Sequence, residues 1–227
     1  MKHKRHIGLR NLSSREQAGS GKERWLRIAL WLVLATMAYN TLEAVVAIWA
    51  GLRARSIALL GFGLDSVIEI LAAVTVLWRL KLEAHGADVG SVEKAEIRVR
   101  RLVGGTFIGL ALYVVGQSSW TLWARETPAE SLLGIVLSVA SLVVMPLVAV
   151  GKMRAGSRIG SRALQSEARE TLACSYLSFC LFLGLAANAV LGWWWADPVS
   201  AFLMVPWLVK EGLEGLSGEA CDGCDEE

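Results

Sequence analysis

Two acidic side chains lie inside an apolar run that is long enough to cross a membrane. The run GFGLDSVIEILAAVTVLW, residues 61–78, carries Asp65 and Glu69 near its middle. A carboxylate at the centre of a bilayer costs roughly 2.5–3.5 kcal/mol on insertion scales. Because the two are spaced i, i+4, a helix places them on one face. That face must meet protein, water or a cation rather than lipid, so we favour a functional cation site over a structural pair bonded to a neighbouring Lys or Arg.

A second set of candidate ligands stands near the start of a later apolar run. In ALQSEARETLACSYLS, Glu170 and Cys174 are again spaced i, i+4, and Glu167 lies one turn earlier. Carboxylate oxygen and thiolate sulfur are both ligands of tetrahedral Zn²⁺, and two such helices would supply the usual four ligands. Taken alone, a Glu of this kind is more often a solvated charge, and an intrahelical Cys more often a packing residue.

The elements that must position these residues are membrane helices. The chain has 227 residues, of which 54% are hydrophobic, and its mean hydropathy is +0.46. About 20 apolar residues span a bilayer as a helix. On that measure we predict an all-α membrane protein with six transmembrane helices, at 26–51, 56–80, 102–123, 130–151, 165–192 and 198–215. We expect a flexible basic tail over 1–25, a transmembrane domain over 26–216 and an acidic tail over 217–227 that contains cysteine.

The distribution of Lys and Arg predicts the orientation of the helices. Seven lie in the N-terminal tail, five in the 81–101 loop and five in the 152–169 loop, whereas the opposite connections hold only Arg53, Arg55 and Arg125. By the positive-inside rule, both termini face the cytoplasm. The start of the chain lacks the pattern of a signal peptide, so we expect the tail to be retained. We expect a multi-pass protein of a bacterial inner membrane or a plasma membrane.

Four segments resemble cation diffusion facilitator transporters. SIALLGFGLDSVIEILAAV resembles the family's second helix, in which S-x-A-L-L precedes an acid or His, a Ser, and an acid four residues after the first. EKAEIR (93–98) resembles the K-A-E element before the third helix, SRALQSEARETLACSYLS the start of the fifth, and WWWADPVSAFLMV the turn into the sixth. The resemblance covers nearly the whole membrane region and is most specific in the second and fifth spans.

The resemblance implies a transport site on two helices. By position, the family's ligands fall on Asp65, Glu69, Glu170 and Cys174. The chain departs from the family because the site has no His, a Cys replaces a carboxylate, and the usual cytoplasmic metal-binding domain is absent from this sequence. The resemblance therefore implies a short, divergent branch, and homodimers are usual in the family.

The ligand types predict a mechanism and a class of cation. Clustered acids repel one another in a low-dielectric site, so we expect the empty site to hold protons that a cation displaces. Sulfur among the ligands favours Zn²⁺ or Cd²⁺ over Mg²⁺, Ca²⁺ or Mn²⁺, with Co²⁺ a further candidate. We therefore predict a proton-coupled antiporter for a divalent cation, most simply zinc efflux, with protons and the cation as substrates and no resident cofactor.

Other classes of protein fit less well. No Ser/His/Asp set or open zinc site with a general base occurs in the spans, so we expect a secondary active transporter rather than an enzyme. We expect no nucleic-acid partner. The alternative is a metal-sensing or scaffolding membrane protein that binds a cation with the same ligands and does not transport it.

Several further residues are candidate accessories. Glu43, near Asn40 in the first span, either joins the site or shuttles protons, or is a carboxylate hydrogen-bonded to Asn40 or to a neighbouring helix. Glu167 is a possible accessory ligand. The tail EACDGCDEE holds Cys221-x-x-Cys224, which captures metal, bridges subunits, has a redox role or belongs to a disordered polar end. Weaker ligand candidates are His3, His6, and His85 with Asp88.

The two pairs of candidate ligands lie at different distances from the outer ends of their helices. Asp65 lies nine residues after Ser56, about 14 Å along the helix, whereas Cys174 lies eighteen residues before Gly192, about 27 Å. The two pairs reach the same depth only if the fifth span projects past the outer surface, tilts or breaks.

Overall fold

The described part of the chain forms six helices, as the sequence predicts. The computed structural model describes the backbone of residues 3–84 and 89–217, and the side chains of residues 23–78, 97, 101–161 and 164–217. Within these residues there are six helices and no strand: α1 (His3–Ala54), α2 (Ile57–Ala84), α3 (Val89–Ala124), α4 (Leu132–Ile159), α5 (Arg162–Leu191) and α6 (Ala196–Ser217). The predicted accessory ligands of the C-terminal tail, Cys221 and Cys224, lie outside the described residues, as do the side chains of His3, His6, His85 and Asp88.

The helices are longer than the apolar spans from which they were predicted. The clearest case is the predicted 152–169 loop, which was wrong, because α4 and α5 are separated only by Gly160 and Ser161. Gly160 has a φ of 74°, a left-handed conformation that suits glycine, and its N–H bonds to the carbonyl of Gly156. Ser161 then caps α5 by accepting from the N–H of Leu164 at 3.3 Å. Hydropathy marks the apolar part of a helix, whereas its hydrogen-bonded length continues into the polar residues.

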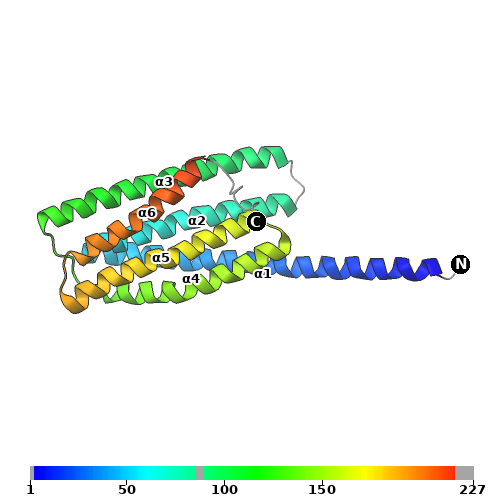
Figure 1. Cartoon of the computed structure of the whole chain (residues 1–227), viewed down its shortest axis with the longest axis horizontal. Helices are drawn as coiled ribbons and strands as arrows, with labels where there is room; N and C mark the ends of the chain where they lie inside the picture. Colours follow the sequence, from blue (N-terminus) through cyan, green and yellow to red (C-terminus); the bar gives the residue numbers. More distant parts are fainter. Residues whose placement is uncertain (1–2, 85–88, 218–227) are drawn as a thin grey trace, which may run out of the picture.

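Helix α1 differs most from the prediction at its N-terminus. Its backbone is helical from His3, so α1 begins within the segment 1–25 that was expected to form a flexible tail. Figure 1 shows this part of α1 extending away from the other helices. No Pro occurs between residues 3 and 54. Once the membrane part of a helix exists, each further residue adds one hydrogen bond without a new nucleation step.

Five of the six helices are apolar and long enough to cross a membrane within the described residues. The sixth, α6, has 22 residues and carries Asp197 in its first turn and Lys210, Glu211 and Glu214 in its last turns. The sequence predicted this helix as a span, and the structure packs it lengthwise against α3 and also against α5 and α2. The architecture is that of an all-α, multi-pass membrane protein.

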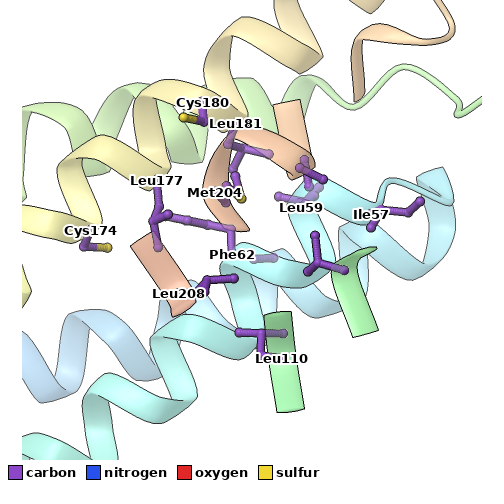
Figure 2. Close-up of a cluster of buried hydrophobic side chains, with 14 of the residues drawn as sticks. Ile57, Leu59, Phe62, Leu110, Cys174, Leu177, Cys180, Leu181, Met204 and Leu208 are labelled. Carbon is purple, nitrogen blue, oxygen red and sulfur yellow. The ribbon is translucent and has the colours of Figure 1, made fainter. Parts of the chain in front are cut away.

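The helices form two groups that share one apolar core. Helices α3 and α6 lie together along one side of α1, α2, α4 and α5 (Figure 1). The backbones of α3 and α6 approach closely at Gly104, where an added Cβ would lie 2.8 Å from the carbonyl oxygen of Gly212. Between the groups, buried side chains of α2, α3, α5 and α6 meet (Figure 2): Leu59, Phe62, Leu110, Leu177, Leu181, Met204 and Leu208.

A carboxylate from α6 caps the N-terminus of α2. Asp197 accepts from the backbone N–H of Ile57 at 2.8 Å and from the hydroxyl of Ser56, and it is fully buried. The hydroxyl of Ser56 in turn accepts from the N–H of Leu59 at 3.1 Å. The free N–H groups at the start of α2 are thereby satisfied by a residue 140 positions away. This contact fixes α2 against the turn between α5 and α6.

Candidate metal centre

Three of the four predicted ligands come together in the interior. One potential ligand atom each of Asp65, Glu69 and Cys174 lies within 4.8 Å of the other two, and the three residues form the one group of three or more His, Cys, Asp and Glu found at this spacing among the described residues. All three are buried. Ligand atoms around one tetrahedral zinc are about 3.5 Å apart, given bond lengths of about 2.0–2.3 Å. Shifts of about 1 Å would therefore bring these atoms around a single ion.

The packing of α2 against α5 brings the three residues together. Phe62 of α2 and Leu177 of α5 both belong to the shared core. Asp65 and Glu69 follow Phe62 along α2, and Cys174 precedes Leu177 along α5. Figure 2 shows the Cys174 side chain directed toward this core, and Cys180 further along α5, beside Leu181 and away from Cys174. Helix α5 is unbroken from Arg162 to Leu191. A break in the fifth span, one of the three ways to match the depths of the two pairs, is therefore excluded.

A small cavity adjoins the three residues and also reaches Glu170. Its volume is about 10 Å³, close to the space that one water molecule requires. It is lined by residues of α2, α3, α5 and α6: Asp65, Glu69, Ala72, Phe107, Glu170, Ala173, Cys174, Trp207 and Glu211. Glu170 thus lies at the cavity, as the fourth predicted ligand should, although it does not belong to the close group of three.

Glu211 lines the cavity without having been predicted as a site residue, because it lies in the charged last turns of the predicted sixth span. A signal was nevertheless present in the spacing along α6. Asp197, Met204 and Leu208 are buried. They are spaced seven and four residues apart, and Glu211 follows Leu208 by three residues, which keeps it on the same helix face. Helical periodicity therefore places Glu211 on the face that α6 turns toward the bundle.

Helix α1 adds a polar stripe beside the α2 pair. Asn40 donates from Nδ2 to Oε2 of Glu69 at 2.6 Å. Glu43, one turn further, accepts from the hydroxyl of Ser66 at 2.8 Å and from the hydroxyl of Ser141. Of the alternatives open for Glu43, the structure shows a buried carboxylate bonded to neighbouring helices α2 and α4, and its sequence neighbour Asn40 bonds to Glu69 instead. Glu43 is not part of the close group of three ligands.

A buried ion pair connects α4 and α5 near the site. Lys152 Nζ lies 2.6 Å from Oε1 of Glu167 and donates to the hydroxyl of Thr171 at 3.0 Å. The Lys152 side chain is 0% exposed and that of Glu167 is 5% exposed. Lys152 was counted among the charges of the predicted 152–169 loop, which was wrong because α4 extends to Ile159. Glu167, predicted as a possible accessory ligand, pairs with this lysine instead.

Comparisons with known proteins identify the family of this chain. A family model described as the cation efflux transmembrane domain matches residues 32–217. An uncharacterized transporter of Synechocystis sp. is 31% identical over 150 residues, which are 64% of this chain and 48% of that protein. Transmembrane protein 163 of Xenopus laevis is 25% identical over 161 residues, which are 71% of this chain and 56% of that protein. The chain thus spans about half the length of the curated relatives that it matches.

The family match covers all of the helices that build the site. The matched residues 32–217 include the whole of α2 to α6 and the part of α1 that carries Asn40 and Glu43. They also hold both halves of the ligand group, from α2 and from α5. We conclude that this chain belongs to the cation efflux family, whose members transport metal cations across membranes.

Proposed function

We propose that the protein exports a divalent metal cation, most simply Zn²⁺, in exchange for protons. The observation that supports this most is the buried group of Asp65, Glu69 and Cys174, which joins α2 to α5 beside a cavity. Ionisable residues inside a membrane are rare and mark ion pathways far more often than they serve structure alone. Two carboxylates and a thiolate supply oxygen and sulfur donors that suit a divalent cation.

The donor set favours particular cations. Thiolate is a soft ligand that suits Zn²⁺ and Cd²⁺, and it disfavours Mg²⁺, Ca²⁺ and Mn²⁺, which prefer all-oxygen sites. Co²⁺ takes similar nitrogen, oxygen and sulfur donors. We propose Glu170 as the fourth ligand, because it lies one turn from Cys174 on α5 and lines the same cavity. Its carboxylate would approach the other three ligands when the cation binds.

Exchange with protons follows from the chemistry of the ligands. Carboxylate and thiolate bind a cation only when they are deprotonated, so binding releases protons and proton return releases the cation. Alternating access of one mid-membrane site to the two sides would then couple the two fluxes. We propose, from the excess of Lys and Arg, that the end of the bundle with Glu170 and Glu211 faces the cytoplasm and receives the cation. We also propose a homodimer.

Flux into sealed vesicles tests the proposed function. Purified protein in proteoliposomes, with a pH gradient across the membrane, should take up Zn²⁺ and release protons, and removal of the gradient should slow uptake. Asp65→Ala should reduce Zn²⁺ flux at least 10-fold, because it removes one charged ligand. Thr75→Ala is the matched control on α2, since among the described residues the Thr75 hydroxyl bonds only to the carbonyl of Leu71 in its own helix.

The same experiment separates transport from the alternative. A metal sensor or scaffold would bind Zn²⁺ with the same residues, yet neither wild type nor Thr75→Ala would move it across the vesicle membrane. Asp65→Ala protein that transports Zn²⁺ at the rate of wild type would show that the site proposed here is not the transport site.

A further inference from the structure

Glu69 has a partner that the ligand set does not include. Asn40 on α1 is 2% exposed, and its Nδ2 lies 2.6 Å from Oε2 of Glu69. The contact joins α1 to α2 at the level of the ligand group. A hydrogen bond to an ionised acceptor is about twice as strong as one between neutral groups.

The amide of Asn40 is oriented by this single contact. Its Oδ1 is buried and finds no hydrogen-bond donor among the described residues. A buried acceptor without a partner costs about 1–3 kcal/mol. The Asn40 amide therefore donates to Glu69 while its own oxygen stays without a donor. The bond to Glu69 is the interaction that fixes the position of the Asn40 side chain.

The contact restricts how Glu69 can hold a cation. With Oε2 engaged by an N–H, the carboxylate binds a cation best through Oε1 alone. One-oxygen binding suits small tetrahedral sites with about four ligands. Ions that require six to eight oxygens gain from carboxylates that bind through both oxygens. The hydrogen bond therefore opposes the larger coordination numbers of Ca²⁺ and of other all-oxygen cations.

We propose that Asn40 is a positioning residue that holds Glu69 in one-oxygen binding and thereby gives the site its preference for tetrahedral cations. This inference rests on the proposed function, because it assigns a role within the same site. Asn40 touches no cation itself. It acts through Glu69, from a helix that contributes no ligand to the close group.

The test compares two cations in three proteins reconstituted in the same vesicles. Asn40→Leu removes the amide at similar volume, and Asn40→Gln keeps an amide donor on a longer side chain. Loss of a residue that orients a ligand typically reduces metal affinity or activity by about 10–100-fold. We expect Asn40→Leu to raise KM for Zn²⁺ about 10-fold and to lower the ratio of kcat/KM for Zn²⁺ over Mn²⁺ by a similar factor. Asn40→Gln should recover part of that ratio.

A spectrum of the purified protein gives a second measurement that does not depend on flux. Tetrahedral Co²⁺ absorbs visible light far more strongly than six-coordinate Co²⁺. Wild type loaded with Co²⁺ should show the intense bands, and Asn40→Leu should show weaker ones. The control is Thr41→Ala, at the next residue of α1, whose hydroxyl bonds to the carbonyl of Met37 and to nothing else in the described part of the chain. It should match wild type in both measurements.

The outcomes distinguish this inference from the proposed function. Asn40→Leu protein that keeps the Zn²⁺/Mn²⁺ ratio and the Co²⁺ spectrum of wild type would overturn the role of Asn40, while transport by wild type would stand. Wild type that binds Co²⁺ in the intense form and moves no cation would overturn the proposed transport. If Asn40→Leu fails to reach the membrane, Asn40→Gln decides. Its longer side chain moves the amide donor away from the place that Asn40 gives it, so a Zn²⁺/Mn²⁺ ratio and a Co²⁺ spectrum equal to those of wild type would contradict the role of Asn40.

Discussion

At the scale of single residues, Cys174 is the candidate ligand that most narrows the class of cation. It is 1% exposed and lies within 4.8 Å of the acidic pair of α2. A buried cysteine in a helix is more often a packing residue, and Cys180, two turns along α5, has that role in the apolar core. The position of Cys174 next to two carboxylates is what makes it a candidate ligand.

Replacing the sulfur with oxygen should therefore change selectivity. Cys174→Asp gives an all-carboxylate site, which harder cations prefer. We expect flux of Cd²⁺ relative to Mn²⁺ to fall at least 10-fold in proteoliposomes, with Zn²⁺ affected less. Cys180→Ala serves as the control and should keep the selectivity of wild type. A Cys174→Asp protein with unaltered rate and selectivity would remove this residue from the site.

The ion pair of Lys152 and Glu167 also makes a prediction at this scale. Removing one partner of a buried pair typically costs about 3–5 kcal/mol, because the other charge remains without compensation. Lys152→Met should therefore lower the melting temperature in detergent strongly, whereas Lys152→Met combined with Glu167→Met should recover much of the loss. If Lys152→Met has the melting temperature of wild type, the ion pair of Lys152 and Glu167 contributes nothing to stability.

At the scale of elements, the sequence predicted the apolar helices and the ligand face of α2, because both depend on local periodicity. It did not predict the partners of those helices. Asp197 was quoted only as part of a turn motif, yet its carboxylate caps a helix that begins 140 residues earlier in the chain. Lys152 was assigned to a loop because hydropathy falls at the end of α4, although the hydrogen-bonded helix continues. Contacts between distant segments leave no periodic signal in a single sequence.

The cap of α2 can be tested through stability. Loss of a helix cap costs about 0.5–2 kcal/mol. Removal of the buried Asp197 carboxylate also leaves the hydroxyl of Ser56 without its acceptor. Asp197→Ala should lower the melting temperature and reduce Zn²⁺ flux, because the register of α2 against α5 sets the distance between the ligands. Ser217→Ala, at the exposed end of the same helix, should behave as wild type. Equal melting of Asp197→Ala and wild type would contradict the role of this cap.

At the scale of the whole molecule, the site lies where the two groups of helices meet. Three candidate ligands come from α2 and α5, and the cavity beside them is completed by Phe107 of α3 and by Trp207 and Glu211 of α6. The family resemblance indicated which residues to examine, and the acidic pair of α2 was predicted from spacing alone. That α3 and α6 would close one wall of the cavity did not follow from any motif, since it depends on the packing of helices remote in the chain.

The cap at Asp197 has a mechanical consequence for that wall. It ties the first turn of α6 to the first turn of α2, so the start of α6 acts as the fixed end of a lever. Glu211 lies 14 residues along, about 21 Å at the rise of an α-helix. A rotation of about 15° about the tied end, comparable to known rigid-body rotations in proteins, would move Glu211 by about 5 Å while Asp197 stays in place. Such a swing would widen the cavity at the Glu211 end and leave the opposite end closed.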